Sequence, residues 1–265
     1  MSFFCVSELS VGYGKNEILH DVSFCVESQN LVGILGANGS GKSTLLKAIC
    51  NILPHRGTCT LEDASMESLS SRQLARLCSY IPQRSGISID IAALDVVLMG
   101  FNPHLRLLEH PTTAMRRQAL EALNLVGLHG KENQNYMTLS EGQKQLCILA
   151  RTLCADSRLL ILDEPESALD FRLRFQMLSI LRSWIQAKQR SALVALHDPS
   201  LALNYCDKLL LISEGTVSHI LHPKTDKLAD MKQKLQIIYG NISLHQCVDK
   251  KGHTNLLMLK EEDYE

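Results

Sequence analysis

Apolar and polar residues alternate over residues 3–30, and this pattern predicts short strands separated by turns. Alternation of this kind suits strands that bury one face and leave the other in solvent. Residues 11–14, Val-Gly-Tyr-Gly, predict a glycine-rich turn that carries one aromatic ring. The apolar positions that carry the alternation are Phe4, Val6, Val22, Phe24 and Val26.

Later strands are predicted from unbroken apolar runs rather than from alternation. Such runs suit strands that are buried on both faces, as in a parallel sheet covered by helices. They lie at 31–35, 158–162 and 191–196. A shorter strand at 78–83 is stopped by proline, and segments 208–213 and 216–219 predict a closing hairpin.

The segment from 89 to 154 has a helical pattern, with loops at 102–104 and 110–111. It lacks the alternation of strands and helices that its flanks show. We therefore expect a helical subdomain, about 89–157, inserted into an α/β core. Other helices are predicted at 44–49, toward the end of 62–76, and at 171–188.

The tail predicts a helix at 224–234 and then two segments, 236–248 and 255–260, that pair across a turn. His245, Cys247 and His253 would approach one another in such a hairpin and form a metal site. Their spacing matches no fixed ligand pattern, so an ordinary hairpin is the favoured interpretation.

Composition excludes several classes of protein. The 265 residues are 45% hydrophobic and carry a formal net charge of −1, which gives no basic field for binding nucleic acid. No apolar run approaches the roughly 18 residues that a membrane span needs, and the first residues lack the features of a secretory signal. We expect a soluble, cytoplasmic protein.

Nine cysteines are scattered along the chain without any C-x-x-C pair. An odd number without metal-ligand spacing is typical of a reducing compartment, where cysteine acts as a small apolar residue. The sequence therefore predicts thiols rather than disulfides.

Residues 36–43 read Gly-Ala-Asn-Gly-Ser-Gly-Lys-Ser, a complete G-x-x-x-x-G-K-S phosphate loop between a predicted strand and a predicted helix. Glycines let backbone N–H groups turn toward phosphates, and the helix start adds a positive dipole end. Lys42 is expected to reach the β- and γ-phosphates, and the Ser43 hydroxyl to bind magnesium. The candidate nucleotide ligands here are Gly36, Ala37, Asn38, Gly39, Ser40, Gly41, Lys42, Ser43 and Thr44.

Polar side chains directly follow three predicted strands, at the sheet edge where α/β proteins place ligands. Gln83 is a candidate ligand of magnesium or water, with a simple loop residue as the alternative. Asp163 suits magnesium, and Glu164 suits polarising an attacking water. His197 is a candidate for hydrogen bonding to the γ-phosphate or for holding the water.

Residues 139–143, Leu-Ser-Glu-Gly-Gln, open the last helix of the helical segment. Ser140 and Gln143 predict a capping box. A serine hydroxyl and Gly142 at a helix start also suit contact with a phosphate, and the two interpretations do not exclude each other.

Aromatic and histidine side chains outside these motifs leave more than one interpretation open. The Tyr13 ring either stacks on an adenine base or packs on its own hairpin. His104, His110 and His129 are isolated, which favours solvated or capping roles over ligation.

In this order, the motifs resemble those of the ATP-binding cassette (ABC) family, over nearly the whole chain to about residue 220. Residues 36–43 match its Walker A motif, and 159–164 its Walker B motif with the catalytic glutamate. The remaining matches are Gln83 to the Q-loop, 139–143 to the signature, 167–170 with Asp170 to the D-loop, His197 to the H-switch and Tyr13 to the adenine-stacking position.

The resemblance implies a P-loop NTPase core with a mostly parallel sheet, an N-terminal antiparallel β subdomain and the inserted helical subdomain. This ATPase domain would span residues 1–222, and residues 223–265 would form a C-terminal extension. Two departures stand out: Glu141 replaces a glycine of the signature, and Glu166-Ser167 stands where threonine-serine is common. Neither removes a group assigned to chemistry.

The resemblance also implies a mechanism in which two chains, expected to be identical, close face to face over two ATP molecules. Lys42, Ser43, Gln83 and Asp163 of one chain would hold the triphosphate and Mg2+. Ser140 and Gly142 of the other chain would close over the γ-phosphate. Glu164 would then activate water with His197 in support.

Segments 99–104 and 197–207 are similar to the ATPases of iron-chelate, haem and cobalamin importers. Those ATPases lie at the cytoplasmic face of the membrane, beneath two permease subunits, and work with an extracellular substrate-binding protein. The alternatives are an exporter's nucleotide-binding subunit and a soluble cassette protein that acts in assembly or regulation. The cargo stays open, since this chain is not expected to touch it.

Overall fold

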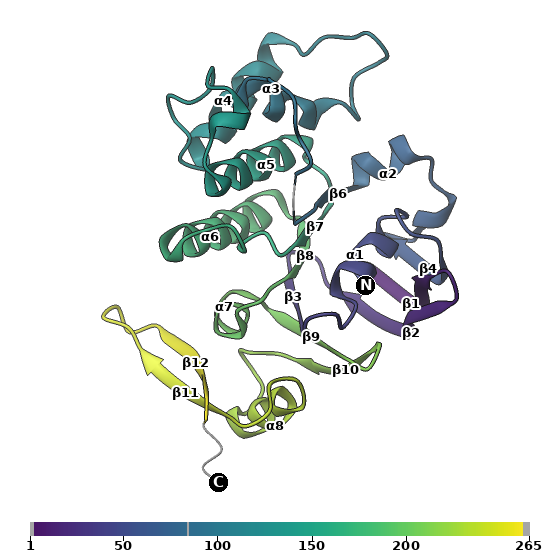
Figure 1. Ribbon diagram of the computed structural model, residues 1–265, viewed down its shortest axis with the longest axis vertical. Coiled ribbons are helices and arrows are strands. Elements are labelled where there is room, and N and C mark those ends of the chain that lie inside the picture. Colours follow the sequence, from purple (N-terminus) through teal and green to yellow (C-terminus); the bar gives the residue numbers. More distant parts are fainter. Residues whose placement is uncertain (1–2, 84, 262–265) are drawn as a thin grey trace. The chain divides into compact units, whose positions relative to one another are not determined.

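The computed structural model describes residues 3–83 and 85–261, and it forms two compact units (Figure 1). The first unit contains the residues up to Glu67 together with those from Leu193 onward. The second unit is Ser68–Ala192. Each unit has its own sheet pairing and its own buried side chains.

An antiparallel sheet forms the N-terminal part of the first unit, with strand order β2-β1-β4-β5. The predicted alternation corresponds to two long strands, β1 (Phe4–Tyr13) and β2 (Asn16–Val26), and the five apolar residues that carry it are almost fully buried. The other two strands are β4 (His55–Leu61) and β5 (Ala64–Ser65).

Strand β4 has an irregularity near its start, where it pairs with β1. The cause is Gly57, which adopts φ +87° and lies so close to β1 that a Cβ would come within 2.4 Å of the Glu8 carbonyl oxygen. Glycine thus allows a local irregularity inside a strand instead of ending it.

The first unit also contains the strands β10, β9 and β3 and the last three residues of β8, which neighbour one another in that order. β3 (Leu31–Gly36) is parallel to β9 (Lys208–Ser213), and β9 forms the predicted hairpin with β10 (Thr216–Leu221). Every residue of β3 is buried, as its unbroken apolar run predicts. The boundary between the units falls within β8 (Ser191–Ala195).

Helices and a terminal hairpin complete this unit. α1 (Lys42–Ile49) follows β3, α7 (Pro199–Tyr205) follows β8, and α8 (Leu228–Tyr239) starts four residues later than predicted. β11 (Ile242–Val248) and β12 (Thr254–Lys260) form the predicted antiparallel hairpin, but residues 236–239 of the predicted first segment belong to α8. Asn204 of α7 exchanges two hydrogen bonds of 2.8 Å with the Leu256 backbone, which holds the hairpin against the helix.

The second unit pairs β6 (Cys78–Ile81) in parallel with β7 (Leu159–Asp163). The long helix predicted at 171–188 has these bounds in the structure. α3, α4 and α5 contact one another and make up the predicted helical stretch. The helices of the unit are α2 (Ser71–Leu77), α3 (Ala93–Leu98), α4 (Thr113–Leu125), α5 (Glu141–Ala155) and α6 (Phe171–Lys188), with short 3-10 turns at Met99–Phe101 and Tyr136–Thr138.

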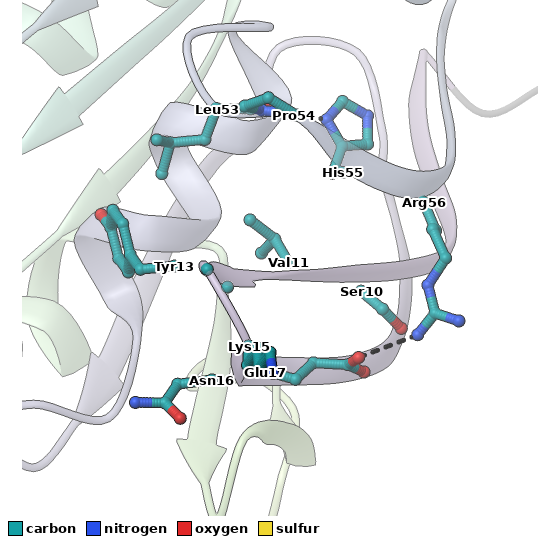
Figure 2. A pocket seen from close by; sticks show the side chains of 12 residues that line it. Ser10, Val11, Tyr13, Lys15, Asn16, Glu17, Leu53, Pro54, His55 and Arg56 are labelled. Atoms are coloured by element: carbon teal, nitrogen blue, oxygen red, sulfur yellow. Dashed lines mark hydrogen bonds and ion pairs between the residues drawn. The ribbon is translucent and has the colours of Figure 1, made fainter.

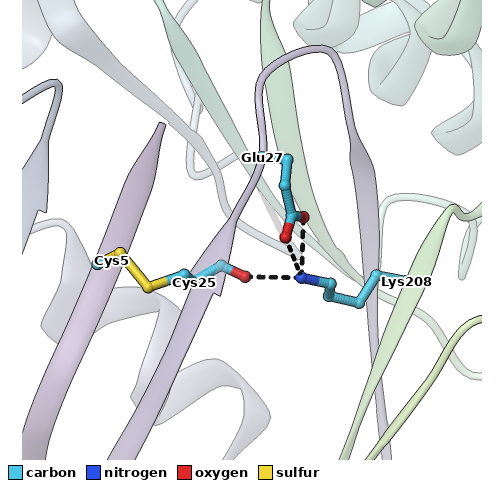
Figure 3. The surroundings of a disulfide bond; sticks show 4 residues. All are labelled: Cys5, Cys25, Glu27 and Lys208. Atoms are coloured by element: carbon cyan, nitrogen blue, oxygen red, sulfur yellow. Dashed lines mark hydrogen bonds and ion pairs between the residues drawn. A yellow bond between two sulfur atoms is a disulfide. The ribbon is translucent and has the colours of Figure 1, made fainter. Parts of the chain in front are cut away.

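A disulfide joins Cys5 of β1 to Cys25 of β2, so the prediction of thiols alone was wrong (Figure 3). The register of the two strands places these residues directly opposite each other, with Cα atoms 4.2 Å apart. Beside the bond, Lys208 Nζ donates a hydrogen bond of 3.0 Å to the Cys25 carbonyl oxygen. It also forms an ion pair of 2.8 Å with the Glu27 carboxylate (Figure 3). Cross-strand register is a tertiary property, which spacing along the chain does not reveal.

Within the part of the chain that the structure describes, no helix combines the length and the apolar character needed to cross a bilayer.

Candidate functional site

The phosphate loop lies in the first unit, between the end of β3 and the start of α1. Gly39 and Gly41 adopt positive φ values of 80° and 101°, a conformation that glycine permits without strain. Ser40 N donates to the Ala37 carbonyl oxygen at 3.1 Å and closes the turn. Lys42 is 5% exposed, and its Nζ donates to the carbonyl oxygens of Gly36 at 3.0 Å and Ala37 at 3.3 Å.

The start of α1 offers a site for an anion. Gly41 is its N-cap and supplies no side-chain hydrogen bond, and the N-terminus of a helix favours an anion. The hydroxyl of Ser40 is buried and has no hydrogen-bond partner among the described residues. A buried donor of this kind, beside a positive helix end and a lysine, fits a phosphate group.

The Tyr13 ring stands at the end of β1 and is 51% exposed. It lines a pocket of about 590 Å³ together with Pro54, His55 and neighbouring residues of β2 (Figure 2). At one side of this pocket, Arg56 and Glu17 form an ion pair of 2.9 Å (Figure 2). An exposed ring facing a pocket suits the stacking of a planar base, which was the functional interpretation of this residue.

In the second unit, the ends of β6 and β7 bring Gln83, Asp163 and Glu164 to one edge. Gln83 Nε2 donates to Glu164 Oε2 at 2.7 Å, and Tyr80 donates its hydroxyl to Asp163 Oδ2 at 3.0 Å. Asp163 and Glu164 are only 3% and 7% exposed. Buried carboxylates need hydrogen bonds or a cation, and these two contacts supply part of that requirement.

Two features of this edge are not evident in the sequence. Tyr80 lies on β6, the strand that pairs with β7. Only the parallel register of the two strands shows that the Tyr80 hydroxyl meets Asp163. Glu164 has φ 49°, which lies in the left-handed region that is uncommon for a non-glycine residue. Backbone strain of this kind is often kept where a side chain must be aimed at a site.

The start of α5 confirms the predicted capping box. Ser140 Oγ accepts from the Gln143 amide at 3.3 Å, and Gln143 Oε1 accepts from the Ser140 amide at 3.2 Å. A Cβ added at Gly142 would meet nothing closer than 3.4 Å, so the chain's own packing does not require glycine there. Glu141, the departure from the family pattern, forms an ion pair of 2.7 Å with Lys144.

A second pocket, of about 650 Å³, lies within the second unit beside α5 and includes Gln83 among its lining residues. Tyr136 donates its hydroxyl to Ser85 Oγ at 2.7 Å in this wall, and burial raises the pKa of Tyr136. Deeper along α5, burial raises the pKa of Cys147 and of Cys154 to about 12. Burial therefore keeps both thiols in their neutral form at pH 7.

Of the other predicted residues, His197 is exposed directly after β8, in the first unit. Asp198 beside it caps α7 by accepting from the Ser200 amide at 2.8 Å. Asp170, in the second unit, caps α6 by accepting from the Leu173 amide at 2.9 Å.

The structure does not gather the tail residues into a metal cluster. His245 contacts Ser243, and His253 contacts Asp249, within the hairpin. His104 bonds the Ala155 carbonyl oxygen at 3.1 Å, and the exposed His129 contacts the Asn124 side chain, which fits the solvated or capping roles expected of isolated histidines.

Comparison with known proteins adds a family relationship to this geometry. Residues 19–167 match the family model described as ABC transporter. The chain is 35% identical over 246 residues to the hemin import ATP-binding protein HmuV of Bordetella pertussis, with 89% of this chain and 93% of that protein covered. It is 32% identical over 211 residues to a probable iron chelatin transport ATP-binding protein of Helicobacter pylori, covering 79% and 83% of the two chains.

A known structure shares the fold over almost the full length. An inward-facing ABC transporter classed as metal-chelate type contains a chain that matches with a TM-score of 0.82 at 23% identity. The match covers 98% of this chain and 99% of the other. At this identity the likeness concerns the fold alone, and it includes the C-terminal helix and hairpin.

Proposed function

Because the chain belongs to the ABC transporter family, we propose that it is the ATP-hydrolysing subunit of an importer that takes up a metal chelate, of the iron-siderophore, haem or cobalamin type. The observation that carries the chemistry is the buried pair Asp163 and Glu164, with Tyr80 and Gln83 bonded to their carboxylates. The phosphate loop supports the same conclusion from the first unit.

ATP is the substrate in this proposal. Lys42 and the N–H groups of the loop from Gly36 to Thr44 bind its phosphates, because they combine a fixed cation with a helix N-terminus. Tyr13 stacks on the adenine base. The buried Ser40 hydroxyl, which lacks a hydrogen-bond partner among the described residues, is a further donor suited to this cradle.

The residues also fit Mg2+, which prefers oxygen ligands. Asp163 offers a carboxylate and Ser43 a hydroxyl. The amide nitrogen of Gln83 donates a hydrogen bond to Glu164, so the amide oxygen of Gln83 is the atom suited to bind a cation. A bound Mg2+ would neutralise charge on the phosphate oxygens.

Glu164 acts as the base that orients and deprotonates the attacking water. Gln83 holds this carboxylate in one direction through the hydrogen bond of 2.7 Å. His197 supports the γ-phosphate or the water, as a donor exposed at the end of a buried strand.

A second copy of the chain completes each site in this proposal. Ser140, Gly142 and Gln143 at the start of α5 close over the γ-phosphate held by the partner, with Asp170 at the start of α6 beside the same face. The packing at Gly142 supports this role, because an added Cβ would make only ordinary van der Waals contacts within the chain, so the chain's own packing does not demand glycine there.

We further propose that the dimer works at the cytoplasmic face of the membrane, as a peripheral subunit beneath two transmembrane permeases. An extracellular binding protein delivers the cargo to those permeases. The HmuV relative, a hemin import protein, and the iron chelatin transport relative support the class of cargo.

The proposal is tested by affinity purification of the chain from its native membrane in mild detergent, with ATPase assays on the recovered complex. We expect polytopic permeases to co-purify and a metal chelate to stimulate hydrolysis. Recovery without a membrane partner, with hydrolysis that no chelate stimulates, would favour a soluble assembly or regulatory factor. Recovery with a permease whose cargo leaves the cell would favour an exporter.

A further inference from the structure

Three side chains with metal-ligating atoms gather in the antiparallel part of the first unit, outside the phosphate loop. His55 and Cys59 belong to β4, and Glu67 belongs to the 3-10 turn Met66–Ser68. A ring nitrogen, a sulfur and a carboxylate oxygen of these residues all lie within 4.8 Å of one another. Within residues 3–83 and 85–261, no other such group is found.

The His55 ring is oriented by the backbone. Its Nδ1 lies 3.2 Å from the Leu53 carbonyl oxygen, and because a carbonyl only accepts, Nδ1 carries a proton. Nε2 lies 3.4 Å from Glu67 Oε1. A ring nitrogen and a carboxylate oxygen are both ligand atoms for a metal ion, and this contact places the two side by side. Metal-bound histidines are commonly fixed in this way, by a hydrogen bond from the other ring nitrogen.

The Glu67 carboxylate is held in place before any ion binds. Oε1 accepts from the Cys59 amide at 2.5 Å, and Oε2 accepts from the Ser65 hydroxyl at 2.8 Å. A carboxylate has about four lone-pair positions, so these two bonds leave capacity for a cation. The hydrogen bond from the Cys59 amide also keeps the carboxylate close to the residue that carries the sulfur.

The sulfur atom distinguishes a metal site from a simple ion pair. A protonated His55 beside Glu67 would need no thiol, whereas a nitrogen, a sulfur and an oxygen are the donor set of Zn2+ and similar ions. Mg2+ and Ca2+ prefer oxygen alone. Cys59 is fully buried and the His55 side chain is 5% exposed, while the Glu67 side chain is 30% exposed and gives solvent access on its side.

We propose that His55, Cys59 and Glu67 bind one divalent transition-metal ion of the zinc class. The Cys59 thiol loses its proton to solvent as its sulfur bonds to the metal, and water takes the fourth position. The ion links β4 to the turn that follows β5. Because His55 also lines the pocket of Tyr13, the ion fixes one wall of that pocket (Figure 2).

The test uses the full chain, stripped of metal with a chelator and titrated with Co2+ as the probe. Cobalt bound to a thiolate absorbs in the near ultraviolet through sulfur-to-metal charge transfer. We expect this band to saturate at one Co2+ per chain and to disappear when Zn2+ is added in competition. We also expect Zn2+ to raise the melting temperature of the wild-type chain, because an ion that binds only the folded state stabilises it.

Variants of the cluster and matched controls assign the site. We expect Cys59→Ala to remove the charge-transfer band, and Glu67→Gln to weaken Co2+ binding at least about tenfold. Cys206→Ala changes another buried cysteine of the same unit, and Cys247→Ala changes the exposed thiol of the tail. Both controls should bind Co2+ like the wild type.

Several outcomes would overturn the proposal. These are an absent charge-transfer band in the wild type, a band that persists in Cys59→Ala, or a band that is lost in Cys247→Ala. Glu67→Gln preserves the shape of a partly exposed side chain, so it decides the question if Cys59→Ala fails to fold. An unchanged Co2+ affinity in folded Glu67→Gln would also contradict the site. None of these readouts depends on ATP hydrolysis, so the metal site and the proposed function fail or succeed separately.

Discussion

Gln83 donates a hydrogen bond of 2.7 Å from Nε2 to Oε2 of Glu164, across 81 positions of sequence. The contact exists because β6 and β7 pair in parallel and end at the same edge. The donor holds the carboxylate in one direction, and a charge-assisted hydrogen bond of this length is among the stronger kinds. Gln83 therefore orients the candidate base Glu164 within the second unit, and this hydrogen bond does not depend on a bound ligand.

Replacement of Glu164 by glutamine tests the base directly. The amide keeps the size of the side chain but accepts no proton, so hydrolysis should fall by roughly 10²- to 10⁴-fold while ATP still binds. The variant should accumulate as an ATP-bound dimer. Phosphate release and size-exclusion chromatography with ATP measure the two effects.

The matched control is Glu214→Gln. Glu214 is also a glutamate with positive φ, at 50°, but it is exposed in the β9–β10 turn. It should hydrolyse ATP like the wild type. Turnover by the Glu164 variant within a few-fold of wild type would remove Glu164 from the role of base.

Several elements were predictable because local signals agree with the tertiary structure. Helix α6 has the predicted bounds, since Asp170 caps its start and the helix pattern runs without a break. The Ser140 capping box and the β9–β10 hairpin were likewise predictable, because helix starts and tight turns depend on residues that are close in the sequence.

What the sequence did not reveal depends on register and close approach. The Cys5–Cys25 bond follows from which residues of β1 and β2 face each other. The Tyr80–Asp163 hydrogen bond follows from the parallel pairing of β6 and β7. The cluster around His55 depends on how β4 approaches the turn after β5, which the sequence does not show.

Substitution of Lys42 by alanine should weaken ATP binding by roughly 10- to 150-fold, which corresponds to the ~1.5–3 kcal/mol of a hydrogen bond to a charged group. In the structure, its Nζ is held within the loop by the carbonyl oxygens of Gly36 and Ala37, at the position where phosphates are expected. Titration with a fluorescent ATP analogue measures the change.

Lys47→Ala is the control, because Lys47 lies in the same helix and belongs to no proposed contact. Circular dichroism should show that both variants remain folded. Equal ATP affinity in Lys42→Ala and Lys47→Ala would argue against nucleotide binding at this loop.

The ion pair with Lys144 should reduce the electrostatic repulsion between Glu141, the acidic residue in the signature, and the γ-phosphate of ATP. Lys144→Ala frees the carboxylate at the start of α5, where it would repel the partner's γ-phosphate. We expect ATP-driven dimerisation to weaken about two- to threefold, in line with the ~0.5 kcal/mol of an exposed helical ion pair.

The double variant Glu141→Gly with Lys144→Ala separates this effect from loss of lysine alone. It should dimerise at least as well as the wild type, because the repelling carboxylate is absent. If the double variant is as weak as Lys144→Ala, the lysine acts through another contact. Analytical ultracentrifugation with non-hydrolysable ATP gives the dimerisation constants.

Loss of the Cys5–Cys25 bond should destabilise the chain by about 3 kcal/mol, the value expected when a disulfide closes a loop of this length. Cys5→Ser with Cys25→Ser removes the bond, and urea unfolding of wild type and variant measures the difference. Reductant should lower the stability of the wild type and leave the double variant unchanged. If reductant has no effect on the wild type, the two strands are held without the bond.

Alkaline pH should weaken the fold through the buried thiols of α5. Burial raises the pKa of Cys147 and of Cys154 to about 12 in the folded chain, above the ordinary value of 9.0. Between these values the folded state binds more protons than the unfolded state, so the free energy of unfolding falls as pH rises above about 9. Burial raises the pKa of Tyr239 to about 12 as well, and this group adds to the loss above its ordinary value of 10.0.

Urea midpoints at pH 7.5, 9 and 10.5 measure this dependence, with Cys147→Ala and Cys154→Ala as the test variants. Each variant should be less stable than the wild type at pH 7.5, because a buried side chain is truncated, but should lose less stability between pH 9 and 10.5. Thiol alkylation gives an independent check: at pH 8 the exposed Cys247 should react at once, while Cys147 and Cys154 should react only when urea unfolds the chain. Rapid alkylation of the two α5 thiols in the folded chain would show that their surroundings open to solvent, and the pH dependence would then lose its physical basis.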